Sequence, residues 1–120
     1  MKIRSSYSQT GEYRTRDGSI IRELMHPEQH GNRNQSLAEA QVPPGTSTHL
    51  HRHRQSEEIY HIVRGSGLML LGEERFAVTR GDSICIPPGT PHCVTNDGDE
   101  SLVILCCCSP AYSHDDTELL

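Results

Sequence analysis

In the stretch from Gly45 to Gly67, one residue separates two histidines, His51 and His53, and acidic residues follow shortly after them. Side chains on a β-strand alternate between its two faces, so this spacing puts both imidazoles on one face of a strand. A tight connection at Arg54 to Ser56 returns the chain as a neighbouring strand, on which Glu58 reaches the same face. Two imidazoles and one carboxylate that converge from neighbouring strands suit a borderline divalent metal ion. The pattern therefore predicts β-structure built around a metal site.

A choice of carboxylate and a third histidine complete the candidate metal site. Alternation favours Glu58, which shares a face with Tyr60, whereas the adjacent Glu57 points to the opposite face. Farther along the chain, His92 follows a rigid Pro-Pro-Gly turn that fixes the direction of one side chain. The predicted metal ligands are therefore His51, His53, Glu58 and His92.

Short apolar runs separated by turn residues occupy most of the chain. Glycine and proline supply turn signals about every 8–12 residues, which indicates a β-sandwich or barrel. The expected strands are 36–42, 48–53, 58–63, 68–71, 75–79, 83–86, 92–95 and 101–107.

The two histidine-bearing stretches resemble the paired motifs of the cupin superfamily. Residues 45–65 fit the first motif, G-x5-H-x-H-x4-E-x6-G, and residues 81–96 fit the second, G-x5-P-x-G-x2-H-x3-N, at every fixed position. The cupin-like strand pattern extends over residues 36–108. The resemblance implies an all-β fold, namely a double-stranded β-helix or RmlC-like jelly-roll cupin barrel.

The chain of 120 residues is one domain by length, divided into an N-terminal arm and loop (1–35), a cupin barrel (36–108) and a C-terminal tail (109–120). In the arm, Asp17-Gly18 favours a type I′ turn, so residues 13–22 are predicted to form a hairpin. The resemblance suggests that such a hairpin packs on a partner subunit. The acidic tail is expected to be disordered or to form one helical turn.

Two further residues are candidates for lining the pocket. His49 has the same parity as His51, which places it either at the mouth of the interior or, as a strand-end residue, half in water. Tyr60 shares the face of Glu58, so its hydroxyl either donates a hydrogen bond in the pocket or is satisfied by backbone within the core.

The donor set and the resemblance together define the expected chemistry. Imidazole with carboxylate suits Fe, Mn, Ni, Cu or Zn, and four protein ligands leave two positions of an octahedral ion open. The resemblance implies dioxygenase, decarboxylase or isomerase chemistry, so a metal-dependent enzyme acting on a small carboxylate, diketone or sugar-like substrate is the leading hypothesis. A non-catalytic metal-binding, ligand-binding or sensor module is the alternative, and a metal-free sugar epimerase is a weaker one.

Composition limits the expected partners and compartment. The formal net charge of −5 argues against nucleic acid, since phosphate binding needs a basic surface. The polar residues 1–18 lack the apolar stretch of a signal peptide or a membrane span. Five cysteines, three of them consecutive at 106–108, make a poor disulfide framework and indicate reduced thiols. We therefore expect a cytoplasmic homodimer with a small-molecule ligand and no nucleic-acid or membrane partner.

Overall fold

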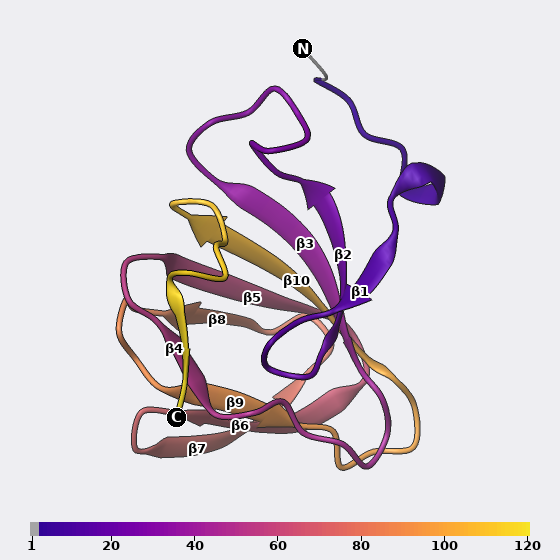
Figure 1. The fold of residues 1–120 in the computed structure, drawn as a ribbon. Helices are drawn as coiled ribbons and strands as arrows, with labels where there is room; N and C mark the ends of the chain where they lie inside the picture. Colours follow the sequence, from indigo (N-terminus) through magenta and orange to yellow (C-terminus); the bar gives the residue numbers. More distant parts are fainter. Residues whose placement is uncertain (1–2) are drawn as a thin grey trace.

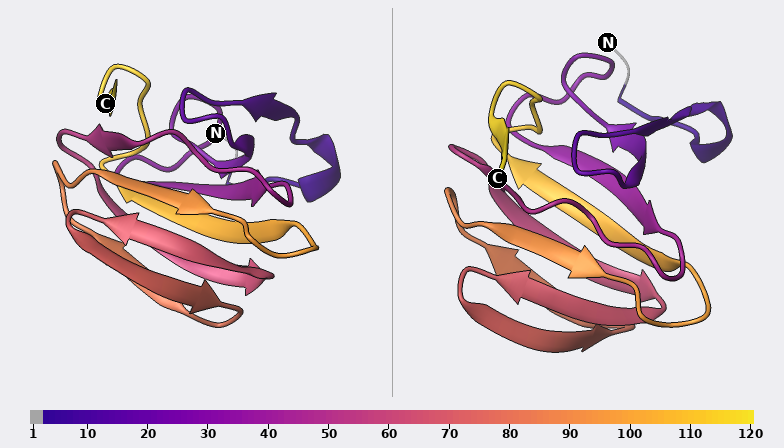
Figure 2. Two further views of the ribbon diagram at one scale, coloured as in Figure 1. Left: turned by 90° about the horizontal axis from the view of Figure 1, so that it is seen from below. Right: turned by 60° about the horizontal axis from the view of Figure 1, so that its bottom comes forward.

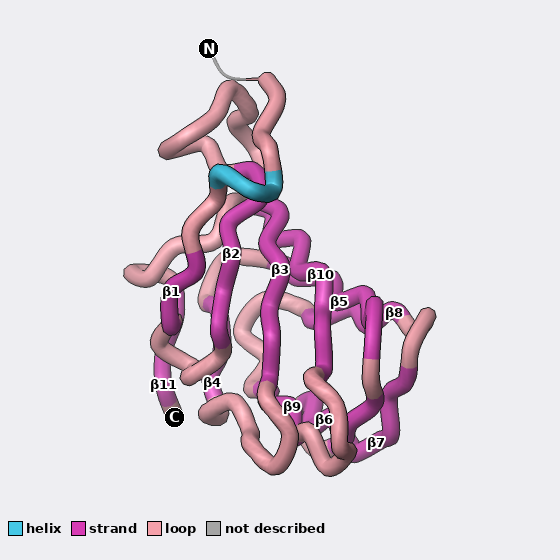
Figure 3. The backbone as a smooth tube through the Cα atoms, turned by 90° about the vertical axis from the view of Figure 1, so that its right-hand side faces the viewer, coloured by secondary structure: helices cyan, strands magenta, loops and turns pink. Residues whose placement is uncertain are grey.

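Residues 3–120, described by a computed structural model, form two β-sheets that face each other (Figures 1 and 2). The six-stranded sheet has the order β1-β2-β3-β10-β5-β8, and the five-stranded sheet has the order β11-β4-β9-β6-β7. Figure 3 shows the strands of the larger sheet side by side. Within the described residues no helix is long and apolar enough to cross a membrane. The elements are η1 (Tyr7–Gln9), β1 (Glu12–Arg14), β2 (Ile20–Met25), β3 (Ser36–Val42), β4 (His51–His53), β5 (Glu57–Arg64), β6 (Ser66–Leu71), β7 (Glu74–Thr79), β8 (Ser83–Ile86), β9 (His92–Thr95), β10 (Leu102–Ser109) and β11 (Thr117–Leu119).

Alternating burial along the strands builds the space between the two sheets. In β5 the side chains of Glu58, Tyr60 and Ile62 are buried, whereas Glu57 and the other intervening residues are exposed. Glu58 therefore points inward and Glu57 outward, as strand parity predicts. The same alternation in β3 and β10 supplies the rest of this wall. The most deeply buried apolar side chains are Val42, Ile62, Met69, Ile86, Val94, Leu102 and Ile104.

Two glycines lie where the chain passes from the larger sheet to the smaller one, Gly65 between β5 and β6 and Gly67 within β6. Gly65 adopts a left-handed conformation with φ of 84°, which other residues rarely tolerate. At Gly67 an added Cβ atom would lie 2.5 Å from the carbonyl oxygen of Thr95. Any side chain at Gly67 would push β6 away from β9, and β9 carries one of the candidate ligands.

The N-terminal arm is a hairpin, but the predicted type I′ turn is wrong. Such a turn needs positive φ at two residues, and only Gly18, with φ of 90°, has it. The Gly18 N–H instead donates to the Thr15 carbonyl at 3.0 Å, and the Thr15 N–H donates to the Ser19 carbonyl at 3.0 Å. A three-residue loop with glycine in the left-handed region results. The arm extends the six-stranded sheet, because β2 pairs with β3 of the same chain.

The C-terminal tail is neither disordered nor helical, so that expectation is wrong. Residues Thr117–Leu119 form β11, which pairs with β4 in the register Thr117 to His53 and Leu119 to His51. The Asp116 carboxylate also accepts hydrogen bonds from the backbone N–H groups of Gln55 and Ser56, at 2.8 and 3.0 Å. The tail therefore holds the turn that joins β4 to β5.

Candidate metal centre

Three buried histidines meet between the sheets. His51 and His53 project from the same face of β4, and His92, at the start of β9, is the cross-strand partner of His51. One ring nitrogen from each histidine lies within 4.8 Å of those of the other two. The rings of His51 and His92 lie with their centroids 4.2 Å apart. Because β4 and β9 are neighbours in one sheet, a single backbone pairing fixes this cluster.

Hydrogen bonds to backbone oxygens set the tautomer of two of these rings. The Nδ1 atom of His51 lies 2.7 Å from the His49 carbonyl oxygen, and the Nδ1 atom of His92 lies 2.9 Å from the Thr90 carbonyl oxygen. A carbonyl oxygen only accepts, so each Nδ1 must carry the proton. In the neutral rings the Nε2 atoms then keep a lone pair. Burial, followed by the charge of His92, lowers the pKa of His51 to about 4, which keeps that ring neutral near pH 7.

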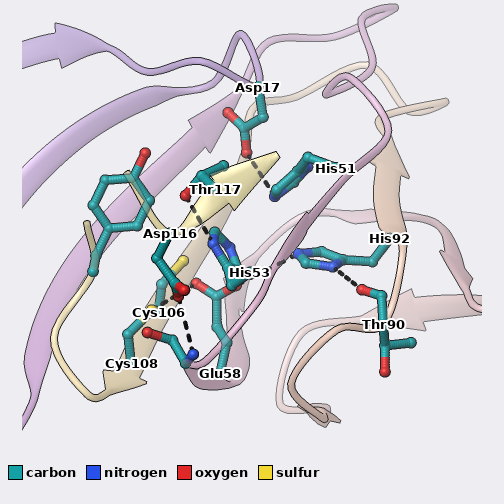
Figure 4. A network of polar contacts seen from close by, with 12 residues as sticks. Asp17, His51, His53, Glu58, Thr90, His92, Cys106, Cys108, Asp116 and Thr117 are labelled. Carbon is teal, nitrogen blue, oxygen red and sulfur yellow. Dashed lines mark hydrogen bonds and ion pairs between the residues drawn. The ribbon is translucent and has the colours of Figure 1, made fainter. Parts of the chain in front are cut away.

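His53 has the same tautomer through a side chain of the C-terminal strand. Its Nδ1 atom lies 2.9 Å from the Thr117 hydroxyl oxygen, and that hydroxyl donates its own proton to the Ser113 carbonyl at 2.9 Å. The hydroxyl therefore accepts from His53 (Figure 4). Histidines that bind metals characteristically donate their second ring N–H in this way. All three Nε2 atoms are thus available as ligands.

Glu58 reaches the cluster from the opposite sheet, so the expectation that its strand lies beside that of His51 and His53 is wrong. Its Oε1 atom lies 3.2 Å from Nε2 of His53 and 3.5 Å from Nε2 of His92. Burial raises the pKa of Glu58, but the two imidazoles outweigh it and lower this pKa to about 2. In turn, burial lowers the pKa of His53 and the Glu58 carboxylate more than offsets it, so the pKa of His53 is raised.

Two buried atoms at the centre of this cluster lack a partner that a cation would supply. Oε1 of Glu58 and Nε2 of His92 are buried and have no hydrogen-bond partner among residues 3–120. A buried polar atom without a partner costs about 1–3 kcal/mol, and a charged one costs more. A divalent ion ligated by both atoms removes this cost, and imidazole with carboxylate is a donor set that first-row transition metals accept. The residues present therefore fit a metal ion.

A second carboxylate, which the sequence does not indicate, lies beside His51. Asp17 comes from the β1–β2 loop and is only 8% exposed. Its Oδ1 atom accepts hydrogen bonds from the backbone N–H and the hydroxyl of Ser19, at 2.9 and 2.6 Å. Its Oδ2 atom lies 3.5 Å from Nε2 of His51. The Asp-Gly pair signals only a turn, and no motif spacing links it to the histidines.

A cavity of about 40 Å³ adjoins the cluster. It is lined by Asp17, His51, His53 and Glu58, by further polar side chains that include Glu23, and by apolar side chains that come mostly from the larger sheet. Since one water needs at least about 10–15 Å³, the cavity holds only a few atoms. Tyr13, Glu23 and Tyr112 line both this cavity and a wider outer groove, so they stand between the site and solvent.

Comparison with known proteins shows the family of the chain and two of its relatives. The sequence profile of the family described as "Cupin domain" matches residues 38–108. The chain belongs to this family. This cupin is 55% identical over 118 residues to the uncharacterized protein MJ1618 of Methanocaldococcus jannaschii, with 98% of this chain and 94% of that protein covered. It is 30% identical over 86 residues to an oxalate-binding protein of Thermotoga maritima, with 72% of this chain and 67% of that protein covered.

Solved structures agree on the fold. A variant of Streptomyces Pac13 with uridine superposes with a TM-score of 0.81 at 16% identity, over 100% of this chain and 92% of that chain. At this identity the likeness shows the fold alone. With the family match, it confirms the predicted all-β cupin jelly roll.

The predicted site residues of this cupin are placed as follows. The three histidines form a cluster, and Glu58 lies against two of them, His53 and His92. Tyr60 lines the cavity, and its pKa is raised by burial and then by Glu58, so its hydroxyl stays protonated. His49 is exposed and lies outside the cavity lining. The chain is irregular just before β4, so His49 does not follow the alternation of that strand. Its backbone N–H instead donates to the Asp17 carbonyl at 2.6 Å.

Proposed function

We propose that this cupin is a metal-dependent enzyme that binds one Fe, Mn, Ni, Cu or Zn ion through His51, His53, Glu58 and His92. The observation that supports the proposal is the cluster of three histidine nitrogens, with Oε1 of Glu58 lying 3.2 and 3.5 Å from Nε2 of His53 and His92. Oε1 of Glu58 and Nε2 of His92 are buried and unpartnered among residues 3–120. A metal ion bound there would supply Lewis-acid chemistry, polarising an oxygen atom of the substrate.

The chain's own residues determine what can reach the ion. The cavity of about 40 Å³ admits only the reacting end of a ligand, and its apolar wall excludes most water. This favours a compact carboxylate, diketone or hydroxyl-bearing molecule that presents oxygen atoms. The Thermotoga maritima relative is named for oxalate binding, which supports a small oxygen-rich ligand. Within the cavity, the protonated Tyr60 hydroxyl is a hydrogen-bond donor for such a ligand.

Metal content tests the site. Elemental analysis of purified protein should find one transition-metal ion per chain, and His51→Ala and His92→Ala should lose it. His61→Ala is the matched control, because His61 lies on the exposed face of β5 and contacts Ser83 instead, at 2.8 Å. If the His51 and His92 variants keep the metal content of the wild type, this ligand set is wrong.

A non-catalytic binding module is the second candidate, and the buried thiols favour it. Burial raises the pKa of Cys106 and of Cys108, so neither transfers protons readily near neutral pH. Turnover discriminates the two functions. Iron-loaded protein is mixed with a panel of small acids, diketones and sugars, and dioxygen uptake and product formation are followed. Consumption of one substrate supports the enzyme, whereas ligand binding without turnover under any metal supports the module.

We also infer a homodimer. Ile59 and Val63 on the outer face of β5 are 46% and 42% exposed. A second copy packed on this face would cover both side chains. Light scattering of the purified protein checks the inference, and a monomer mass overturns it. Ile59→Lys should then lower the measured mass, while Glu73→Lys, at an exposed position between β6 and β7 of the other sheet, serves as the control.

A further inference from the structure

We propose that Asp17 is a fifth protein ligand of the metal centre, supplied by the N-terminal hairpin from outside both cupin motifs. The inference rests on the proposed function, since it requires an ion at the histidine cluster. Asp17 would add a second carboxylate to the donor set and would change which further ligands the ion can accept.

A cation would stabilise the contact between Asp17 and His51. Nε2 of His51 carries no proton in the tautomer set by the His49 carbonyl, so the 3.5 Å contact with Oδ2 joins two electron-rich atoms. Oε1 of Glu58 faces Nε2 of His92 at the same distance of 3.5 Å. With metal–ligand bonds of about 2.1 Å, two ligands of one ion lie about 3.0–3.5 Å apart. Each contact therefore has the spacing of two ligands that share an ion. Among residues 3–120 the group of ligand atoms within 4.8 Å of one another comprises the three histidine nitrogens, so the Asp17 carboxylate would move toward the other histidines as the ion binds.

The Asp17 carboxylate is oriented with one oxygen free. Ser19 provides both hydrogen bonds to Oδ1, through its backbone N–H and its hydroxyl. Oδ2 is left to face the histidines, and Figure 4 shows the carboxylate above the ring of His51. The oxygen that faces the site is thus the one that Ser19 does not occupy.

The loop that carries Asp17 is held in place from two sides. Its backbone carbonyl accepts from the His49 N–H at 2.6 Å, which ties it to the segment before β4. The neighbouring Arg16 donates to the carbonyl oxygens of His114 and Thr117, at 3.1 and 3.0 Å. Thr15 contacts the Tyr112 hydroxyl at 3.2 Å. Asp17 is therefore fixed against the site by the segment before β4 and by the C-terminal tail.

A fifth ligand changes the charge and the openness of the site. Three neutral imidazoles and one carboxylate leave a dication with one positive charge, whereas a second carboxylate makes the site neutral. An uncompensated charge is costly in an apolar cavity, so the neutral site favours a neutral ligand, or one that binds through a single oxygen. One octahedral position stays open instead of two. A chelating dianion such as oxalate must then displace Asp17 and bring excess negative charge.

Metal titration tests the ligand role. Apo wild-type protein and Asp17→Asn are titrated with Zn²⁺ against a chromogenic chelator, and the variant should bind about 10–100-fold more weakly, the scale on which disturbed metal-site contacts act. Asn keeps an oxygen for Ser19, so the hairpin should stay folded, and apo unfolding temperatures check this. Asp82→Asn is the matched control: it removes the same charge from an exposed turn and should not alter affinity.

Spectroscopy and anion binding separate ligation from a structural role. The visible absorption of Co²⁺-loaded protein should be stronger in Asp17→Asn than in wild type, because cobalt absorption intensifies as coordination number falls. Zn²⁺-loaded Asp17→Asn should bind oxalate at least about tenfold more tightly than Zn²⁺-loaded wild type. Equal Zn²⁺ affinity with an unchanged cobalt spectrum would overturn the inference, as would equal oxalate binding. Failure of wild type itself to bind any metal would overturn the proposed function as well.

Discussion

The thiol of Cys108 donates a hydrogen bond to Oε2 of Glu58 at 3.2 Å, and this leaves Oε1 as the oxygen that faces His53 and His92. Burial, followed by the Glu58 charge, raises the pKa of Cys108, so the thiol keeps the proton that it donates. Cys108→Ala should therefore lower metal affinity about tenfold, because the carboxylate loses the contact that orients it. Competition with a chelator measures this loss.

Two variants on the same strand serve as controls. Cys108→Ser restores a donor and should recover part of the affinity. Cys107 points to the other face of β10, so Cys107→Ser should bind metal like wild type. If Cys108→Ala retains wild-type affinity, the thiol packs beside Glu58 without orienting it.

The Thr117 hydroxyl links the C-terminal strand to the ring of His53. Thr117→Val keeps the shape of the side chain but removes both the acceptor for His53 and the donor to Ser113. We expect about tenfold weaker metal binding and a loss of about 1–2 kcal/mol in the free energy of unfolding. Thr117→Ser keeps the hydroxyl and should restore both quantities. Unchanged metal affinity in Thr117→Val would show that His53 does not depend on this contact.

Asn96 stabilises the loop that follows β9. Its side chain is fully buried, donates to the carbonyl oxygens of Val42 and Glu100, and accepts from the Gly98 N–H. Asn96→Ala leaves these groups unsatisfied and should lower the free energy of unfolding by about 3 kcal/mol, measured by urea titration. The exposed Asn34 provides a control, and Asn34→Ala should stay within about 0.5 kcal/mol of wild type. Similar stabilities for the two variants would contradict this role for Asn96.

Stability of the apoprotein should fall on acidification because of His51. Burial and then His92 lower its pKa to about 4 from an ordinary value of 6.5. Between these values the unfolded chain binds the proton and the folded chain does not, so the free energy of unfolding falls as pH drops from 6.5 to 4. Over this pH range, His51 should lower the free energy of unfolding by about 2–3 kcal/mol. Urea titrations in EDTA should show a smaller loss for His51→Asn than for wild type, and parallel losses would refute the assignment.

Strand parity explains why the interior side of the site could be predicted. Glu58 and Tyr60 lie on a regular strand paired on both edges, so alternation alone settles which face they occupy. His49 shows where this rule ends. Thr48 is buried and His49 exposed in a segment outside any strand, and the loop of Asp17 lies against it.

The contributions of the two terminal segments could not be predicted, because they depend on contacts distant in sequence. Asp17 lies in a hairpin whose turn signal says nothing about what the loop will face. Thr117–Leu119 is too short and too acidic to show a strand pattern, and β11 forms because β4 offers it an open edge. The arm and the tail reach the histidines only after the two sheets have assembled.

The position of β4 affects the order in which the protein folds and binds metal. Its two histidines contact the N-terminal loop through Asp17 and the C-terminal strand through Thr117. Contacts that close such long stretches of chain form late in folding. A bound ion would then stabilise the chain only after both ends have docked, because metal affinity and the docking of the two ends are thermodynamically linked. A chain nicked or shortened at either end would release its metal before it unfolds.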